Sequence, residues 1–362
     1  MRSTTDQNDM ARCFGYSTRS LRRYQERLRV AGLVDSPRSV GQHNELVFSH
    51  SPQSLNFPDL VLVNPSAGGG AAKDATPRLE AFAAQNGWRV DLRRTTSAED
   101  LAMKAGAGLA RGYRRVFALG GDGTFQQLAN AIGVGQEVVL GVLPAGGGND
   151  LAQCLGLPLD PVLAAKILLD GEIRFLDAAR VRTSDGKQRL YLGGGGVGLD
   201  AQAAQHAGGA YRNIRGRSRY LLAAIRALIG FHPLEIRASI ECDENSEFEA
   251  QVLVLGVLNT PSYGAGLRLA PEAKTDDGKL NLVLVENLPL FEILRLLPRL
   301  MMQGELRTKR VRRQTLRRIR IETQTPAKFH GDGEILGWTP VEIEVVPRAI
   351  RMLCPRSGFS QG

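Results

Sequence analysis

The sequence predicts an α/β fold class in two parts: a parallel sheet covered by helices on both faces, followed by an antiparallel β domain. Three observations predict it. Short apolar runs alternate with helix-like segments over residues 58–177, a spacing that is typical of a three-layer α/β domain. Glycine-rich loops directly follow three of these apolar runs. From residue 178 to residue 346 strand-like segments dominate, which favours an antiparallel sheet.

The elements of both parts follow from hydrophobic periodicity. Strands are expected where apolar residues run consecutively or alternate, and helices where they recur every three or four positions. In the first part the expected strands are 60–63, 88–92, 116–119 and 138–143, and the expected helices are 79–86, 99–109, 125–132 and 151–155. In the second part the expected strands are 190–192, 236–242, 249–258, 280–285, 319–323 and 341–346, with helices at 218–229 and 290–302.

Composition narrows the class of partner and compartment. The chain has 362 residues and a net charge of +9, which favours an anionic partner such as a nucleotide, a nucleic acid or an acidic membrane. Its four cysteines lack metal-ligand spacing, as is usual in a reducing cytosol. No apolar run is long enough to cross a bilayer. We therefore expect a cytoplasmic protein with at most peripheral membrane contact.

Residues 1–57 differ from the rest of the chain. Ser17 is a suitable helix N-cap, and Leu21, Tyr24 and Leu28 fall on one helical face among several arginines. This pattern resembles the second half of a helix-turn-helix, so contact of residues 1–40 with nucleic acid stays open. A basic helical extension or a misassigned start is the alternative. Residues 35–58 are expected to be a linker.

The most informative stretch is Gly120-Gly121-Asp122-Gly123-Thr124, between an expected strand and an expected helix. Glycines allow backbone N–H groups to approach an anion, and a helix N-terminus adds free N–H groups. Asp122 would repel a phosphate unless a cation or a phosphoryl acceptor lies between them, so nucleotide and metal chemistry is indicated. The alternative is a tight turn capped by Thr124. Two further glycine loops, at 64–70 and 144–150, would lie at the same sheet edge, where α/β proteins bind ligands.

From about residue 60 to residue 355 the chain resembles the diacylglycerol kinase catalytic-domain family, which includes sphingosine and ceramide kinases. The ordered motifs that carry the resemblance are 64–69, 120–124, 144–150, Gly196-Val197-Gly198-Leu199-Asp200-Ala201, 263–266, 271–273, 276–280 and Asp332-Gly333-Glu334. The resemblance implies an N-terminal nucleotide domain related to NAD kinases and phosphofructokinases. It also implies a β-sandwich-like second domain, residues 178–346, and a final segment, residues 347–356, that returns to the first domain.

The resemblance further implies transfer of the ATP γ-phosphoryl group to a lipid hydroxyl, with Mg²⁺ as the metal. Glu334 matches the general base, and Asp122 would orient a metal ion or the acceptor. Asp277, with the backbone carbonyls of Lys274 and Lys279, matches a metal site. The residues that match nucleotide-binding positions are Asn64, Pro65, Ser66, Ala67, Gly68, Thr95, Gly120, Gly121, Asp122, Gly123, Thr124, Phe125, Gln126 and Gly147.

Two positions depart from the family pattern. Gly147 stands where Thr or Ser is usual, and Gly193 stands where Asn is usual. Both changes weaken side-chain hydrogen bonding and keep the backbone path, so either ATP binds more loosely or the main chain holds the phosphate donor. Two basic stretches, 211–219 and 307–320, are candidates for docking on anionic lipid. For the second stretch, a charged strand edge that discourages sheet pairing is the alternative.

The expected function is therefore an ATP-dependent lipid kinase with a diacylglycerol-like or sphingoid acceptor, and the family also favours a homodimer. Two alternatives remain at this point. One is a kinase of a soluble substrate, similar to NAD kinases, because it shares the Gly-Gly-Asp-Gly-Thr core. The other is a DNA-binding regulator with a kinase-like body that senses a ligand.

Overall fold

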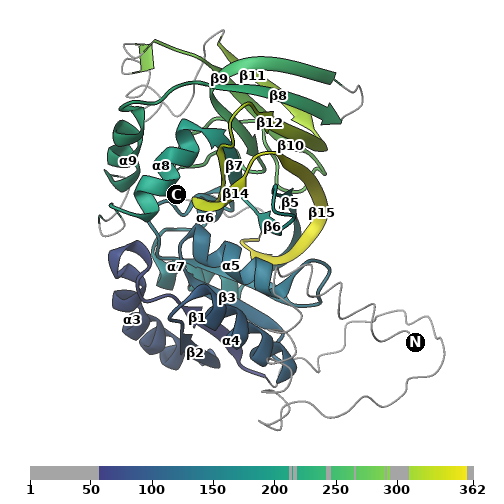
Figure 1. Ribbon diagram of the computed structural model, residues 1–362. Coiled ribbons are helices and arrows are strands. Elements are labelled where there is room, and N and C mark those ends of the chain that lie inside the picture. The colour runs from purple at the N-terminus through teal and green to yellow at the C-terminus, as the bar shows by residue number, and fades with distance from the viewer. Residues whose placement is uncertain are drawn as a thin grey trace, which may run out of the picture.

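The computed structural model describes residues 57–211, 214, 218–241, 246–264, 266–289, 292–293 and 310–356. The expectations for residues 1–56, for most of the helix at 290–302 and for part of the basic stretch at 211–219 lie outside these residues. In Figure 1 the N-terminal half of the described chain forms the lower part of the molecule and the C-terminal half forms the upper part.

Four parallel strands form the centre of the N-terminal half. They are β1 (Asp59–Val63), β2 (Val90–Arg94), β3 (Arg115–Gly120) and β4 (Val139–Pro144). Their spatial order is β2-β1-β3-β4, and each neighbouring pair is parallel. β1 and β4 are buried along their whole length, as expected for strands with helices on both faces.

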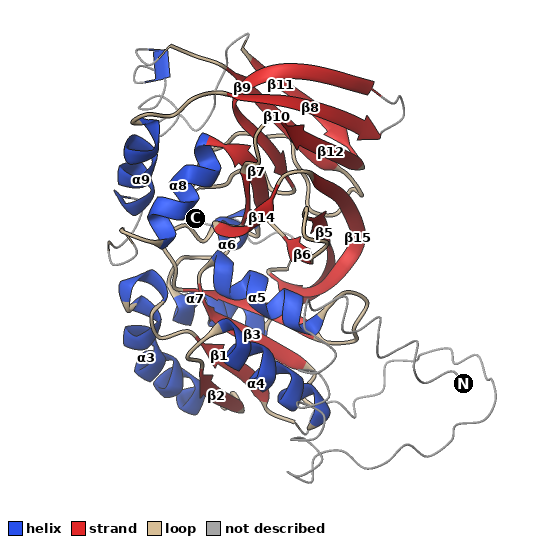
Figure 2. Ribbon diagram, viewed as in Figure 1, coloured by secondary structure: helices blue, strands red, loops and turns tan. Residues whose placement is uncertain are grey.

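Helices cover both faces of this sheet. They are the 3₁₀ turn η2 (Ala67–Gly69), α3 (Ala71–Gln85), α4 (Ala98–Ala110), α5 (Asp122–Ile132), α6 (Asp150–Cys154) and α7 (Pro161–Leu169). α3 and α7 contact each other and pack on β1 and β4, whereas α4 and α5 contact each other and pack on β1 and β3 (Figure 2). The expected three-layer α/β arrangement is thus confirmed.

The C-terminal half consists mainly of antiparallel strands. Its elements are β5 (Glu172–Arg182), β6 (Gln188–Tyr191), β7 (Gly194–Gly198), α8 (Leu199–Gly208), α9 (Ser218–Leu228), β8 (Leu234–Glu241), β9 (Ser246–Leu258), β10 (Leu280–Glu286), β11 (Val311–Leu316), β12 (Arg318–Thr323), β13 (Lys328–Gly331), β14 (Glu334–Trp338) and β15 (Val341–Cys354). α8 and α9 pack against each other, and α8 also contacts β7, β13 and β14.

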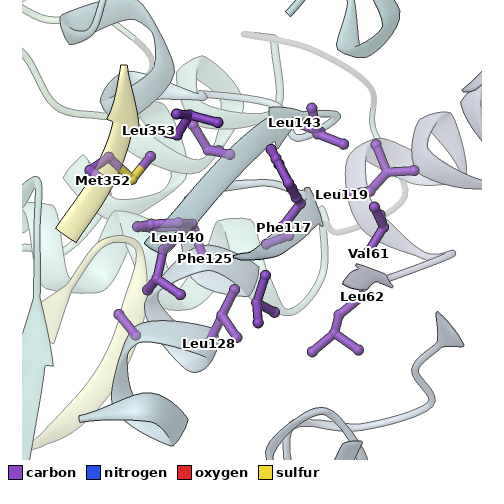
Figure 3. Close-up of a cluster of buried hydrophobic side chains, with 14 of the residues drawn as sticks. Val61, Leu62, Phe117, Leu119, Phe125, Leu128, Leu140, Leu143, Met352 and Leu353 are labelled. Carbon is purple, nitrogen blue, oxygen red and sulfur yellow. The ribbon is translucent and has the colours of Figure 1, made fainter. Parts of the chain in front are cut away.

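β15 joins the two halves into one 15-stranded sheet, whose main path among the described strands is β14-β13-β7-β9-β8-β12-β15-β4-β3-β1-β2. Its first part pairs antiparallel with β12, and its last part pairs parallel with β4 at Arg351 and Met352. Figure 3 shows Met352 and Leu353 beside the apolar side chains of the N-terminal core, including Leu140 and Phe125. The expected boundaries at 177/178 and 346/347 both fall inside strands, β5 and β15, at the bulge where the β5–β15 register shifts between Val346 and Ile350. Pairing of these two strands resumes beyond the bulge, so β5 and β15 extend across both boundaries.

One sequence-based expectation was wrong in detail. The helix expected at 79–86 begins at Ala71, because Gly68, Gly69 and Gly70 take φ values of 61°, 66° and 98° and turn the chain directly into it. The strand expected at 319–323 is present as β12, which pairs with β8 and β15. The preceding part of the basic stretch forms a separate strand, β11, which pairs with β10.

The charge of that stretch is also partly compensated. Arg312 lies 2.6 Å from Glu286, Arg320 lies 2.8 Å from Glu322, and Arg318 pairs with Glu342. Exposed pairs of this kind contribute little stability, but they reduce the positive potential of the surface. The described part of the stretch therefore offers less charge to an anionic membrane than its sequence indicates.

Candidate active site

The three glycine loops meet at the carboxyl ends of β1, β3 and β4 and approach one another closely. A Cβ on Gly146 would lie 2.4 Å from the Cα of Gly121, and a Cβ on Gly68 would lie 2.2 Å from the carbonyl oxygen of Ala145. Such distances leave no room for a side chain, so the loops pack backbone against backbone. Helix α5 begins at this edge, and the free N–H groups of a helix N-terminus form the kind of surface that binds phosphate.

A polar side-chain network ties the first two loops together. Asn64 Nδ2 donates to Thr124 Oγ1 at 2.9 Å, and Asn64 Oδ1 accepts hydrogen bonds from the backbone and hydroxyl of Ser66. Thr95 donates from both its backbone and its hydroxyl to the Val63 carbonyl. The structure therefore brings the predicted residues of the first and second loops together. Thr124 is only 5% exposed, and its observed contact shapes the loop.

The remaining predicted nucleotide residues differ in their surroundings. The Phe125 side chain is part of the buried core, so only its backbone belongs to the loop. Gln126 is also buried, and its Nε2 donates 2.9 Å to the Gly331 carbonyl of the C-terminal half. Gly147 lines a groove of about 470 Å³ between the third loop, α3 and α7. This groove continues from the loops and has room for a nucleoside.

Asp122 occupies the first position of α5 and faces the start of α6. Its Oδ1 accepts the backbone N–H of Leu151 at 3.2 Å. Burial raises the pKa of the Asp122 carboxyl, and the backbone N–H groups at the start of α6 act in the opposite direction. Asp150, in the first turn of α6, accepts the backbone N–H of Gly266 at 2.7 Å, so this short helix connects the glycine loops to the C-terminal half.

Two more carboxylates reach this region from the turn between β13 and β14. Asp332 accepts the backbone N–H groups of Leu192, Gly193 and Gly194 at 2.8, 2.8 and 3.3 Å. Burial is the main cause that raises the Asp332 pKa to about 7, and the negative charge of Asp122 adds to it. Asp122 and Asp332 are therefore close enough for their charges to interact.

Glu334, the predicted general base, lies against the first turn of α5. A Cβ on Gly123 would be 2.9 Å from Glu334 Oε1, so the carboxyl packs directly over this glycine. Burial by the surrounding cleft raises the pKa of Glu334, and the Arg219 guanidinium opposes that increase. An acid with a raised pKa next to a candidate phosphate-binding loop is suited to proton transfer.

An apolar cavity of about 250 Å³ opens beside these acids. Its wall includes side chains of α9, β9 and β10 and of the segments before and after β10, among them Leu221, Ala224, Leu253, Leu269, Val285 and Leu288. Asp122, Asp150 and Asp332 line the same cavity. The cavity thus places hydrocarbon surface next to the carboxylates of the cradle.

The predicted metal ligands lie elsewhere. Asp277 belongs to the turn before β10, and its Oδ1 accepts the backbone N–H of Lys279 at 3.0 Å. Neither Asp277 nor Lys274 lines the cavity that contains Asp122. Within the described ranges no three acidic, histidine or cysteine side chains converge as a metal site. The assignment of Lys274, Asp277 and Lys279 to a metal therefore stays a prediction.

Three residues near the reacting region were not selected from the sequence as site residues. Asp150 and Asp332 belong to recognised motifs, but nothing local showed that both would face Asp122 across the chain. Arg219 was noted only as part of a basic stretch, yet it stands near Glu334 and stacks over the Tyr220 ring at 5.1 Å. The sequence signal that could have identified the two aspartates is an acidic residue next to glycines in a turn. Turns without any functional role show the same pattern, so this signal is weak.

Comparison with known proteins gives consistent results. The family described as "Diacylglycerol kinase catalytic domain" matches residues 58–181, and the "YegS C-terminal NAD kinase beta sandwich-like domain" matches residues 167–354. The diacylglycerol kinase of Mycobacterium tuberculosis is 31% identical over 302 residues, covering 82% of this chain and 95% of that protein. The diacylglycerol kinase of Bacillus subtilis is 25% identical over 303 residues, covering 83% and 97%.

The same fold occurs in a solved structure. A crystal structure of a Bacillus anthracis diacylglycerol kinase superimposes with a TM-score of 0.62 at 19% identity, covering 83% of this chain and 97% of that one. This likeness concerns the fold alone. It agrees with the observed combination of an α/β domain and an antiparallel β domain.

Proposed function

The chain belongs to the diacylglycerol kinase family of lipid kinases, and from this membership we propose that it transfers the γ-phosphoryl group of ATP to the hydroxyl of a lipid alcohol. Mg²⁺ would accompany the nucleotide, since it is commonly held by one or two carboxylates together with substrate phosphates. The acceptor would be diacylglycerol-like or sphingoid.

One observation supports this proposal most directly: Asp122 belongs both to the glycine cradle and to the apolar cavity. The cradle suits a polyphosphate because two of its contacts, at Gly68 and Gly146, exclude any Cβ. The cavity suits an acyl chain because its wall is mostly apolar. A soluble polar substrate would leave this apolar wall in contact with water, so the cavity favours a lipid over the soluble-substrate alternative.

The residues have distinct proposed roles. Glu334 would take the proton of the lipid hydroxyl, because its raised pKa brings it closer to neutral pH. Asp122 would orient Mg²⁺ or the acceptor at the N-terminus of α5. Arg219, which lies near Glu334, would stabilise negative charge on the transferred group. ATP, when bound, supplies the phosphoryl group, and Mg²⁺ neutralises part of its charge.

The proposal is tested by offering ATP and Mg²⁺ with lipid alcohols in mixed micelles to the purified protein and identifying products by mass. We expect a phosphorylated lipid. Asp122→Asn and Glu334→Gln should each lower kcat by roughly 100-fold or more, because each removes a group that acts on the reacting atoms.

Matched controls are Asp170→Asn and Glu235→Gln, which remove the same charges from exposed positions that do not line the cavity. Their kcat should stay close to that of the wild type. No lipid product from the wild type would contradict the proposed function. Full activity of both site variants would contradict the assigned roles.

We also propose that the enzyme takes its substrate from a membrane surface through α9. This helix separates the cavity from solvent: Tyr220, Leu221 and Ala224 line the cavity. On the outer side, Leu222, Ile225 and Ile229 are 42%, 42% and 68% exposed. Their spacing of three and four residues places them along one face. No helix in the described ranges has the length and hydropathy required to span a bilayer. An exposed apolar stripe on the wall of a lipid cavity supports peripheral contact.

A further inference from the structure

A buried polar cluster lies in the wall of the otherwise apolar cavity. Asp200 Oδ2 accepts a hydrogen bond from the Tyr263 hydroxyl at 2.8 Å and lies 3.1 Å from His330 Nε2. The Tyr263 ring stacks on the His330 imidazole, with centroids 5.7 Å apart and an interplanar angle of 17°. All three residues line the cavity. Placing a carboxylate in such a wall costs desolvation free energy, which indicates a role beyond packing.

The Asp200 carboxylate of this cluster has hydrogen-bond acceptor sites that its contacts with the described residues do not fill. A carboxylate offers about four acceptor sites. Two of the Asp200 acceptor sites, both on Oδ2, are used by Tyr263 and His330, and Oδ1 accepts the backbone N–H of Ala201 at 2.8 Å. The Asp200 side chain keeps 8% exposure, so a further donor can reach it.

His330 adds a second, independent sign of incomplete hydrogen bonding. Because a carboxylate only accepts, the imidazole proton lies on Nε2, and Nδ1 of the neutral ring is then an acceptor. His330 is 2% exposed, and its Nδ1 has no hydrogen-bond partner within the described ranges. An unsatisfied buried acceptor destabilises the folded protein, and a donor from a ligand would offset that cost.

The charges around the cavity restrict the ligand further. Among the described residues that line it, the charged side chains are Asp122, Asp150, Asp200 and Asp332, and none is lysine or arginine. A negatively charged headgroup would face like charges in a poorly hydrated site. The acidic wall therefore disfavours a negatively charged ligand, and the leftover acceptors favour one that carries a hydrogen-bond donor.

We propose that Asp200, Tyr263 and His330 form a polar subsite that selects a lipid alcohol without negative charge that carries a second donor, such as a hydroxyl or an amide N–H, near the reacting hydroxyl. This inference rests on the proposed lipid kinase function and narrows its acceptor class. An N-acylated amino alcohol of the ceramide type fits the subsite. A diacylglycerol does not use it, because its one donor is the hydroxyl that reacts.

The test compares a ceramide and a diacylglycerol with matched acyl chains in the same mixed micelles. For the wild type we expect kcat/KM to be at least about tenfold higher for the ceramide, since a single hydrogen bond in a buried site is worth about this factor. His330→Phe keeps the ring and its stacking but removes the nitrogens, so this ratio should fall to about one. Tyr263→Phe, which keeps the stacking and removes one donor to Asp200, should lower the ratio less.

Tyr220→Phe is the matched control, because it removes a hydroxyl from the same cavity wall outside the cluster. It should change kcat/KM for both lipids alike and leave their ratio unchanged. A wild type that prefers diacylglycerol or phosphatidylglycerol would overturn the inference. The inference would also be overturned if His330→Phe and Tyr263→Phe both left the ceramide-to-diacylglycerol ratio of kcat/KM unchanged. Thermal unfolding would verify that both variants are folded.

A binding measurement separates this inference from the proposed function. Displacement of a fluorescent ceramide from the full-length protein, by ceramide or by diacylglycerol and without ATP, reports the subsite directly. Absence of any phosphorylated lipid would refute the kinase function while the displacement ratio still decides the subsite. Equal displacement by both lipids would refute the subsite even if turnover is observed.

Discussion

Substituting Gly123 by alanine should stabilise the fold and yet impair the enzyme. Gly123 lies in the first turn of α5, and its φ is not in the left-handed region, so alanine fits the backbone. Replacing a helical glycine by alanine is worth up to about 1 kcal/mol. The added Cβ would lie 2.9 Å from Glu334 Oε1 and 3.3 Å from its Cγ. An ordinary van der Waals contact requires about 3.4–4 Å, so the carboxyl must move by roughly 0.5–1 Å.

A displacement of this size is small for the fold and large for proton transfer. Misplacing a catalytic group by about 1 Å can lower a rate by around 100-fold, so we expect kcat to fall by roughly 10- to 100-fold. The assay is initial-rate phosphorylation of a lipid alcohol, with stability measured by urea unfolding. Gly208→Ala is the matched control: Gly208 ends α8, and a Cβ there meets nothing within 4 Å. It should gain stability without loss of activity.

A double-mutant cycle sharpens this test. If Gly123→Ala acts through Glu334, it should have no further effect on kcat in the Glu334→Gln background. Unchanged kcat of the Gly123→Ala single variant would refute the reasoning, because Glu334 would then not act from the observed position. Equal losses in both backgrounds would show that alanine disturbs the cradle itself.

Three further outcomes are expected from other parts of the molecule. Gln126→Leu removes the buried hydrogen bond to the Gly331 carbonyl, so urea unfolding should show a loss of about 1–3 kcal/mol; an unchanged midpoint would contradict this. The Asp332 pKa is raised from 3.8 to about 7, so the folded protein binds this proton more tightly than the unfolded chain. Its contribution to stability is therefore lost as the pH rises from about 4 to 7, and Asp332→Asn should flatten that pH dependence relative to the wild type; identical slopes would contradict it. Ile225→Glu on α9 should weaken sedimentation with lipid vesicles, whereas Ile173→Glu, at a comparably exposed position on β5, should not.

Much of the N-terminal half could be predicted from local patterns. Continuous apolar runs are typical of strands buried on both faces, and glycine loops after such runs lie at the ligand-binding edge of a parallel sheet. The helix that begins at Ala71 was expected too late, because small residues and Pro77 weaken its periodicity. The positive φ values of the glycines before it set where the helix begins. Glycine allows these φ values but does not require them, so the sequence alone does not fix the start.

The surroundings of the site were less predictable. Asp332 reads as part of an Asp-Gly turn, and its contacts with residues 192–194 bridge about 140 positions of the chain. Likewise, His330 and Asp200 meet only because β13 pairs with β7 beside the start of α8. No local periodicity encodes such contacts, since they depend on strand order and register.

The sequence by itself therefore determined the family, the glycine loop around Gly121 as a candidate phosphate cradle and Glu334 as a candidate base, because these depend on short motifs whose backbone needs are local. Only the tertiary structure decided how the acids share one cavity, how Gly123 makes room for Glu334 and which polar groups stand in the apolar wall. These depend on β15 and the β13–β14 turn bringing the C-terminal half onto α5. Long-range pairing sets those distances, and distance in turn sets the charge interactions on which the chemistry depends.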